Sequence, residues 1–514
     1  MGWSEAVFWR AGGPSSILYR MIGKLQRVLL SPVFYALTGA VLLSIASLTG
    51  APMGNDEGVW AYLGRIWADH GLLPYSGAIE NKATGIYMVY ALSHKLFGFN
   101  IWWPRLLALA AIVGTAGLIY AITKRLSDSR AALFALAIFL LIMPLASLDS
   151  AYAETESFMN FFRVLAILLT LIAYAKEKNK SLWLMLSGIS VAFAISFKQL
   201  AILDAVPLLF FHIVLAKREI KQIIINLLYV FFGLLAGTFV SLIPYLLSGG
   251  TIANYIDGAW LILLQSGSSP HSLVSRASGF FRHFFNVRLS FLTMAMVAFI
   301  ALRKKIQGIT VFTLPLLVWA ITDFIAYNAD GWYLDHHYKV FVSSWSIVFG
   351  IVISYSIYHI AGNLKHEAYN RIAAYTLLAL IIFYIPFEPN YFHSIRKAIK
   401  GGGEFDRSGE NLGLYIRAHT RPNDHIYIWG WHIGAGYYYS DRVASSRYFS
   451  EPFLGRPGAM AELQSDLERK PPALIAIPLQ TYFMSSIPPW FVSYVAREYK
   501  QTDDQFGFHI YARL

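Results

Sequence analysis

The sequence predicts a polytopic α-helical membrane protein with a small α/β domain outside the membrane at its C-terminus. The first observation is composition: 56% of the 514 residues are hydrophobic and only 14% are charged, whereas soluble domains carry about 25% charged residues. The second is that about eleven segments approach the roughly 20 apolar residues that cross a bilayer as a helix. The third is that residues 388–514 lose this pattern and show short strand-like runs between polar stretches.

The predicted spans follow the apolar runs in order along residues 1–387, the predicted transmembrane domain. Each has a length suited to a membrane helix. They are Pro32–Thr49, Trp102–Thr123, Ala131–Leu148, Ser157–Tyr174, Leu182–Phe197, Leu200–Ala216, Ile224–Leu247, Phe284–Leu302, Thr310–Tyr327, Val340–His359 and Ile372–Phe387. The first is longer than the apolar part of a signal peptide, so we expect it to remain as an anchor.

Basic residues indicate how the spans are oriented. They precede the first span and gather in alternate connections: Arg10, Arg20, Lys24 and Arg27, then Lys124-Arg125, Lys176–Lys180, Lys217-Arg218, Arg303–Lys305, and Lys365 with Arg371. Because short cytoplasmic loops are enriched in lysine and arginine, the N-terminus and these connections are predicted to be cytoplasmic. The net charge of +12 is thereby explained without nucleic-acid binding. An odd number of spans places residues 388–514, the extracytoplasmic domain, on the other side.

Two amphipathic helices are predicted in the first outer loop. Apolar residues recur at helical spacing from Glu57 to His70, and a second such helix runs from Thr84 to Leu96. Gly71 is suited to end the first helix. Because Arg65 and Asp69 make this helix too polar to span, we expect it to lie on the outer membrane surface with its apolar face down.

Two adjacent acids and a lysine in this loop, Asp56, Glu57 and Lys82, are candidates for chemistry. A carboxylate at the edge of the bilayer can take a proton from a hydroxyl group, and a lysine can stabilise a phosphate leaving group. The alternative is structural. Asp56 can cap the helix with Glu57 in its favourable first turn, and Lys82 can be a solvated loop residue.

The C-terminal residues predict alternating short strands and helices. Ile426–Trp429 and Leu474–Ile477 have the character of buried strands, and Phe506–Ala512 of a last strand. Leu414–Arg417 and Ala459–Glu468 are predicted to be helical. Such a domain lies within the normal size range.

Four groups of residues in the first outer loop resemble the signature of the GT-C glycosyltransferases. They are Asn55-Asp56-Glu57-Gly58, Leu73-Pro74-Tyr75, Glu80–Tyr87 and Leu96-Phe97-Gly98. The likeness is to the bacterial branch similar to dolichyl-phosphate-mannose protein mannosyltransferases and aminoarabinose transferases. That branch usually has Pro-Pro where this chain has Ala83-Thr84, and aspartate where it has Glu80. Residues 153–159, 415–417, 426–430 and 446–448 also resemble the family.

The resemblance implies a fold, a reaction and roles for several residues. The protein would be an inverting membrane glycosyltransferase that moves a sugar from a polyprenyl-phosphate donor to an acceptor hydroxyl. The acceptor would be a cell-envelope glycan, a lipid or a protein at the outer face of the bacterial cytoplasmic (inner) membrane. Asp56 would be the general base and Lys82 would contact the lipid phosphate. Glu156 would match the family's second glutamate.

Further candidates lie in later outer connections. Glu154 and Glu156 are two residues apart, so on a helix at most one should face a cavity, and the resemblance favours Glu156. The alternative is an acidic pair that stabilises a helix N-terminus. Lys198 lies at the end of a span and could bind substrate, pair with Asp204, or extend toward the interface.

The segment Asp335–Lys339 contains adjacent histidines and is the densest polar cluster between the late spans. The resemblance favours contact with the donor phosphate through His337 or Tyr338, and a solvated loop is the alternative. Adjacent histidines rarely converge on one ion, and their spacing is not that of a zinc site, so no metal site is predicted. Arg447, in the C-terminal domain, is a candidate substrate-binding residue or an ordinary surface charge. Arg276, Arg282 and Arg288 could bind phosphate or lipid head groups.

The sequence says less about cofactors and about a function other than glycosyl transfer. The sequence has no cysteine, which excludes disulfides and thiolate metal sites. No cofactor is required, although adjacent acids could hold Mg²⁺ or Mn²⁺. The alternative function is a transporter or flippase of lipid-linked saccharides. Such proteins tend to show internal repeats and ionisable groups near the middle of the membrane, whereas the strong acids of this chain gather in the outer loops.

Overall fold

The computed structural model describes residues 14–48, 51–144, 149–176, 178–265, 297–302, 310–328, 335–361, 366–384, 406–431, 433–479 and 487–514, and the single residues 274 and 278. Three sequence predictions therefore lie wholly or largely outside the described residues. They are the span Phe284–Leu302, the arginines Arg276, Arg282 and Arg288, and the domain boundary between residues 387 and 388.

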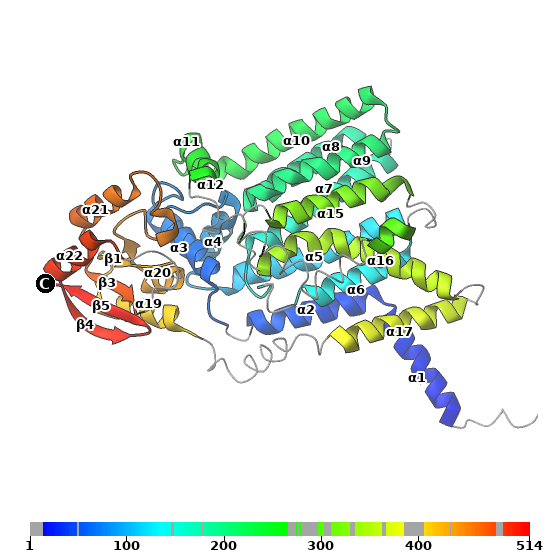
Figure 1. Ribbon diagram of the computed structural model, residues 1–514, viewed down its shortest axis with the longest axis horizontal. Coiled ribbons are helices and arrows are strands. Elements are labelled where there is room, and N and C mark those ends of the chain that lie inside the picture. The colour runs from blue at the N-terminus through cyan, green and yellow to red at the C-terminus, as the bar shows by residue number, and fades with distance from the viewer. Residues whose placement is uncertain are drawn as a thin grey trace, which may run out of the picture.

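The protein consists of a helical bundle and a small α/β domain that covers one end of it (Figure 1). Helix α1 (Pro14–Leu29) lies at the opposite end of the bundle. Two helices of the first predicted outer loop, α3 (Asn55–His70) and α4 (Thr84–Phe97), lie between the bundle and the α/β domain. The predicted fold class is confirmed.

The bundle is built from apolar helices that coincide with the predicted spans of the described chain. They are α2 (Pro32–Leu48), α5 (Trp102–Leu126), α6 (Ser129–Ile142), α7 (Thr155–Ala175), α8 (Lys180–Phe197), α9 (Ala205–Leu215), α10 (Ile220–Leu247), α15 (Thr313–Asn328), α16 (Lys339–Ala361) and α17 (His366–Tyr384). Among the described residues, five helices (α5, α7, α8, α10 and α16 with the turn before it) are long and apolar enough to cross a membrane. With the shorter apolar helices, they make this a multi-pass membrane protein.

Short elements join these helices. After α10 the chain forms α11 (Ile252–Ile256), the π-helical turn η3 (Asp257–Leu261) and α12 (Ile262–Gln265). The 3-10 turns η4 (Thr310–Phe312) and η5 (Asp335–Tyr338) precede α15 and α16.

Two predicted spans differ from the structure. The segment Leu200–Ala216 is not one helix, because the 3-10 turn η2 (Gln199–Asp204) precedes α9. Pro207, which lacks an amide hydrogen, fits the first turn of the new helix. Helix α6 ends at Ile142, earlier than predicted, because Pro144 cannot donate the hydrogen bond that would continue it.

Helix α3 does not lie with a polar face toward solvent, and this prediction is wrong. Its residues from Glu57 to Trp67 are all buried. Arg65, expected on the polar face, is fully buried and donates to Asp441 Oδ1 at 3.0 Å and to the carbonyl oxygen of Arg442 at 2.7 Å. The α/β domain covers this side of α3, which the local pattern of residues could not reveal. Gly71, with φ of 65°, ends the helix as predicted.

The contact between α3 and α20 (Gly434–Ser440) brings two backbones together. A Cβ atom on Gly58 would lie 2.5 Å from the amide nitrogen of Ala435, and one on Gly434 would lie 2.1 Å from that of Val59. Tyr62 adds a hydrogen bond, because its hydroxyl accepts from the amide of Ala444 at 2.9 Å. Only glycine permits this approach, so the α/β domain is closely packed on the first outer loop.

The α/β domain contains one mixed five-stranded sheet. Its strands are β1 (His425–Ile428), β2 (Val443–Ala444), β3 (Leu474–Pro478), β4 (Tyr499–Gln505) and β5 (Phe508–Arg513), in the order β2-β1-β3-β5-β4. Strands β2, β1 and β3 are parallel, and β5 is antiparallel to β3 and β4. The helices are α19 (Ser408–His419), α20, the 3-10 turn η7 (Glu451–Phe453), α21 (Ala459–Arg469) and α22 (Pro489–Glu498). The predicted strands and helices of this domain are found, with β5 starting two residues later than predicted.

Candidate active site

Asp56 is the second residue of α3, at the helix end where backbone amides favour a carboxylate. Its side chain is half-buried, and its carboxylate makes no hydrogen bond or ion pair with any residue that the structure describes. Gly54, rather than Asn55 or Asp56, is the N-cap. Asp56 is therefore not needed as a cap, and its carboxylate is open to a ligand.

The next residue, Glu57, has the opposite environment. It is fully buried, and Arg105 donates to both of its oxygens at 3.0 and 2.6 Å. The backbone amides of Gly54 and Ala153 donate to it at 3.2 and 3.3 Å. Arg105 also donates to the carbonyl oxygen of Ala51 at 3.0 Å. Glu57 thus connects the start of α3, the start of α5 and the chain before α7.

Lys82 lies in a loop held by tyrosine side chains. The hydroxyl of Tyr87 and the amide of Lys82 both donate to Glu80 Oε2, at 2.6 and 3.0 Å. The hydroxyl of Tyr75 donates to the carbonyl oxygen of Lys82 at 2.8 Å. Lys82 Nζ donates to Asn81 Oδ1 at 3.0 Å. These bonds fix the direction of the lysine in a loop where the sequence departs from the family's Pro-Pro.

The charge of Lys82 is stabilised by its neighbours. Burial alone lowers its pKa, but the carboxylates of Glu80, Asp56, Glu156 and Glu154 outweigh that effect and raise the pKa above its usual value. Lys82 is therefore an ammonium group that faces the acids of two outer connections.

Glu154 and Glu156 both lie in this site, so the prediction that at most one faces it is wrong. Glu154 is the N-cap of α7, outside the helix, and Glu156 is in the first turn. The rule about helix faces therefore does not apply to the pair. Glu156 forms an ion pair with Lys198 and lies 3.9 Å from His337 Nε2. Both glutamates act electrostatically on Lys82 and on Lys339.

Burial changes the protonation of Glu154. Its Oε2 atom is buried and receives no hydrogen bond from the described residues. Burial and the nearby carboxylate of Asp56 raise its pKa to about 8, although His336 and Lys339 act in the opposite direction. At neutral pH this carboxyl group is mostly protonated and could donate a hydrogen bond.

Lys339 completes the site and was not predicted. It is the first residue of α16 and is fully buried, and Nζ has no hydrogen-bond partner among the described residues. A buried unpaired ammonium group is costly, and an ionisable residue at this depth indicates function. In the sequence, the signal was its place at the end of the polar segment Asp335–Lys339, where the resemblance favoured His337 and Tyr338.

Arg163 of α7 organises a second group of charges. Its guanidinium donates to Asp204 Oδ1 at 2.6 Å and also binds Asp323 of α15. Ser344 Oγ donates to Asp323 Oδ2 at 2.5 Å. We call Arg163, Asp204, Asp323 and Ser344 the Arg163 cluster. The pairing of Asp204 with Lys198, one of the alternatives left open by the sequence, is not found, because Asp204 binds Arg163 and Lys198 binds Glu156.

The Arg163 cluster holds the start of α16 in place. Arg163 Nη1 donates to the carbonyl oxygen of Val340 at 2.7 Å, and Asn160 Nδ2 donates to that of Lys339 at 2.8 Å. The same arginine binds Asp204 at the end of the turn that begins after Lys198. The backbones that carry two lysines of the site are thus fixed by one buried arginine.

Tyr338 and Arg447 are the remaining residues that the sequence predicted for the site. Tyr338 is buried and its ring centroid is 4.5 Å from that of Tyr327. Arg447 donates to Glu462 at 2.6 and 2.8 Å and to the carbonyl oxygen of Tyr75 at 3.5 Å. Arg447 therefore joins the α/β domain to the first outer loop.

Glu156, His336 and His337 bring ligand atoms within 4.8 Å of one another. The expectation that adjacent histidines do not converge is wrong here, because the 3-10 turn η5 directs both toward Glu156. Two imidazoles and one carboxylate suit Zn²⁺ or Mn²⁺ better than Mg²⁺, which prefers oxygen ligands. However, Glu156 Oε1 already binds Lys198, and His336 Nδ1 lies 3.3 Å from Asp149. An ion would have to displace both contacts.

These residues form one site with a clear chemical character, which we call the Asp56 cluster. Its members are Asp56, Lys82, Glu154, Glu156, Lys198, His337 and Lys339. It combines an open carboxylate, a carboxyl group that is neutral near pH 7, and three lysines around Glu156. Such a set can accept a proton on one side and stabilise an anion on the other.

Comparison with known protein families gives one match. Residues 81–243 match the family model described as dolichyl-phosphate-mannose-protein mannosyltransferase. No curated protein has a significant match to the chain.

Solved structures share the fold. The crystal structure of ArnT from Cupriavidus metallidurans bound to undecaprenyl phosphate superposes with a TM-score of 0.59 at 14% identity, covering 94% of this chain and 98% of that one. The oligosaccharyltransferase of Archaeoglobus fulgidus, tethered with an acceptor peptide, gives a TM-score of 0.57 at 14% identity, covering 87% and 69%. These structures share the fold over most of the chain, and the family model matches residues 81–243.

Proposed function

We propose that this protein transfers a sugar from a polyprenyl-phosphate donor to a hydroxyl group of an acceptor, with inversion at the anomeric carbon. The observation that carries the proposal is the unpaired carboxylate of Asp56 near Lys82, which also lies near Glu156, the partner of Lys198 and a neighbour of Lys339. ArnT was crystallised with undecaprenyl phosphate, and the structure of the archaeal oligosaccharyltransferase was solved in complex with an inhibitory peptide and a dolichol-phosphate. These relatives support a lipid-phosphate donor. The sugar would be a hexose or a pentose, and the acceptor a glycan, a lipid or a protein.

The residues divide the reaction between them. Asp56 takes the proton of the acceptor hydroxyl, and the oxygen attacks the anomeric carbon as the bond from that carbon to the phosphate oxygen breaks. The bonding electrons leave with the polyprenyl phosphate, whose charge Lys82, Lys339 and Lys198 stabilise. His337 and the protonated Glu154 donate hydrogen bonds to the donor. Glu156 aligns Lys198, whereas Glu57, Tyr338 and Arg447 position the loops and helices around the site.

A divalent cation is compatible with one part of this site. Glu156, His336 and His337 would hold Mn²⁺ or Zn²⁺ if Lys198 moved away, and the ion would supply positive charge near the phosphate. One relative, the archaeal oligosaccharyltransferase, was crystallised in complex with Zn and sulfate. The lysines of the Asp56 cluster can neutralise the charge of the phosphate themselves, so the proposed reaction does not require the ion.

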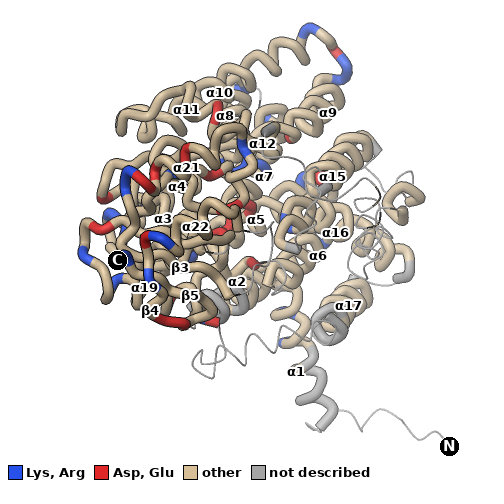
Figure 2. Tube along the Cα trace, turned by 60° about the vertical axis from the view of Figure 1, so that its left-hand side comes forward, with Lys and Arg blue, Asp and Glu red and all other residues tan. Residues whose placement is uncertain are grey.

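The orientation follows from the distribution of charge. The connection between α9 and α10 carries Lys217, Arg218 and Lys221 and lies at the end of the bundle away from the α/β domain (Figure 2). This supports a cytoplasmic location for that end. We therefore propose that the α/β domain and the Asp56 cluster face the outside of a bacterial cytoplasmic membrane.

Replacement of Asp56 by Asn tests the proposal. Transfer from an extracted polyprenyl-phosphate sugar should fall by about 10²–10⁴-fold, the contribution typical of a general base, with an unchanged melting temperature. Asp69→Asn is the matched control, because Asp69 lies on the same helix but pairs with His94 at 2.8 Å, and it should retain transfer. Intact transfer by Asp56→Asn would remove Asp56 as the base, whereas absence of transfer by the wild-type protein would favour a transporter or flippase. Lipid-linked sugars that accumulate in cells lacking the protein would identify the donor.

A further inference from the structure

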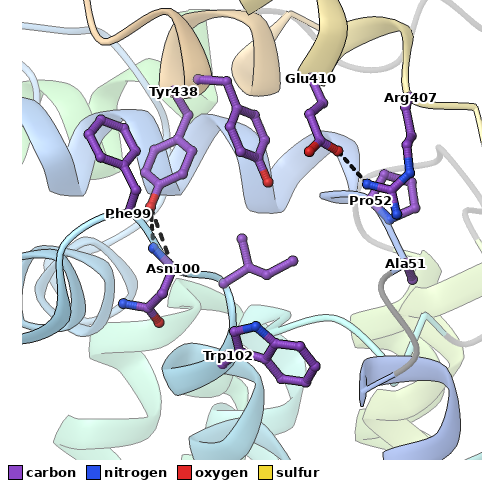
Figure 3. A pocket seen from close by; sticks show the side chains of 10 residues that line it. Ala51, Pro52, Phe99, Asn100, Trp102, Arg407, Glu410 and Tyr438 are labelled. Atoms are coloured by element: carbon purple, nitrogen blue, oxygen red, sulfur yellow. Dashed lines mark hydrogen bonds and ion pairs between the residues drawn. The ribbon is translucent and has the colours of Figure 1, made fainter. Parts of the chain in front are cut away.

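A pocket of about 220 Å³ lies between the bundle and the α/β domain (Figure 3). Three parts of the chain form it: Ala51 and Pro52 after α2, residues 99–102 at the start of α5, and residues of α19 and α20 with the chain just before α19. No member of the Asp56 cluster lines it. Behind Ala51 and Pro52, the side chain of Arg105 holds both carbonyl oxygens and binds Glu57.

The lining of this pocket combines aromatic rings with one ion pair. Arg407 Nη1 lies 2.6 Å from Glu410 Oε2, and Trp102 and Tyr439 supply ring surface. The hydroxyl of Tyr438 is used, because it accepts from the amide of Asn100 at 3.1 Å. The hydroxyl of Tyr439 has no hydrogen-bond partner among the described residues.

These features define the class of ligand. The charges of Arg407 and Glu410 cancel, and Glu410 would repel a phosphate, so the lining does not select an anion. A few polar groups among aromatic surfaces are typical of small-molecule sites. The volume is below the roughly 300–1,000 Å³ of pockets for drug-sized ligands, which limits the occupant to about one ring. A sugar ring meets these conditions, because it has an apolar face for an aromatic ring and hydroxyl groups that both donate and accept.

We propose that this pocket binds one sugar ring of the acceptor, so that the acceptor is a glycan or glycolipid and not a protein. The inference rests on the proposed transferase function. The pocket lies at the residues that lead into α3, because Pro52 precedes Asp56 by only four positions. One ring of the acceptor could therefore be held there while another part of the molecule reaches Asp56. Phe97, Phe99 and Trp102 are exposed at the same boundary, a position suited to the lipid part of a glycolipid.

Saturation-transfer NMR on the purified full-length protein tests this without turnover. The probes are the methyl glycosides of glucose, mannose, galactose and N-acetylglucosamine, with glycerophosphoethanolamine as a lipid-head-group probe. At least one methyl glycoside should bind the wild-type protein saturably. Its affinity should be about tenfold weaker in Glu410→Ala, a loss of about 1.4 kcal/mol. The affinity should fall further when Trp102→Ala is added. Asp56→Asn should bind as the wild type does. Glu498→Ala is the matched control, because the exposed Arg497–Glu498 pair does not line the pocket.

Three outcomes would overturn the proposal: no glycoside saturates, saturation persists unchanged in the Glu410 and Trp102 variants, or only glycerophosphoethanolamine binds. The last result would assign the pocket to a membrane phospholipid. This measurement does not depend on sugar transfer. If the protein binds a glycoside but transfers no sugar, the transferase proposal fails and the pocket proposal stands.

Discussion

The two buried groups of charges in this protein differ in how completely their hydrogen bonds are formed. In the Arg163 cluster, the guanidinium binds two carboxylates and a backbone carbonyl, and a serine binds the second carboxylate. In the Asp56 cluster, three groups have no partner among the described residues: the carboxylate of Asp56, Glu154 Oε2 and Lys339 Nζ. Both groups include residues of α7 and α16, so membership of a helix does not explain the difference.

Physical chemistry explains what this difference means. Buried polar groups in proteins are nearly always hydrogen-bonded, because an unpaired one costs about 1–3 kcal/mol. A complete network stabilises the fold. An incomplete one, in which an acid and an ammonium group lack partners side by side, is expected where a ligand supplies the missing bonds. We therefore propose that the Arg163 cluster stabilises the fold and that the Asp56 cluster binds substrate.

The largest effect should come from breaking the complete network. Arg163→Met leaves Asp204 and Asp323 buried without a counter-charge, and loss of one partner of a buried ion pair typically costs about 3–5 kcal/mol. We expect a large fall in the melting temperature in detergent, with transfer lost through misplacement of α16.

A triple variant supplies the control for that prediction. Arg163→Met combined with Asp204→Asn and Asp323→Asn removes all three charges, and replacement of a whole buried ion pair is often neutral. Most of the stability should return. If the single variant is as stable as the wild type, the assignment of this cluster to structure is wrong.

The incomplete network should respond in the opposite way. Lys339→Met removes a buried ammonium group that has no partner, so the melting temperature should stay the same or rise. The KM for the polyprenyl-phosphate donor should rise by about 10–100-fold, because hydrogen bonds to charged groups contribute about 1.5–3 kcal/mol. Lys95→Met on α4 is a control, since Lys95 is exposed and lies outside the site. A destabilised Lys339→Met variant with an unchanged KM would place Lys339 with the structural residues.

The sequence predicted the parts of this site that depend on local patterns. Asp56 stands at a helix start marked by a glycine and an amphipathic repeat, and Lys82 follows in the same loop. These signals lie within about thirty positions of each other in the sequence. The bundle could also be predicted, because each apolar run has the length of a membrane helix.

Other features depend on contacts between distant residues. Asp323 and Arg163 are 160 positions apart, and the pairing of Arg65 with Asp441 spans 376 positions. Helix α20 has the sequence Gly-Ala-Gly-Tyr-Tyr-Tyr-Ser, which lacks helical periodicity, and its glycines serve the close contact with α3. The burial of α3, and the lack of a hydrogen-bond partner for Lys339 Nζ among the described residues, follow from tertiary contacts of this kind. A single sequence does not contain that information in its local pattern.

The smallest effect should be a pH dependence that arises from Glu154, and so from the Asp56 cluster and not from the Arg163 cluster. Because burial and Asp56 raise its pKa from 4.5 to about 8, the fold favours the neutral form, and the stability that this provides falls from about pH 4.5 upwards and is lost by about pH 8. Above that pH a new negative charge appears beside the donor phosphate. The KM for the donor should be constant from about pH 6 to 7.5 and several-fold higher at pH 9, an effect of about 1 kcal/mol. In Glu154→Gln, which stays neutral, both the KM and the melting temperature should lose this dependence. A rise in KM that persists in Glu154→Gln would assign the titration to a group other than Glu154.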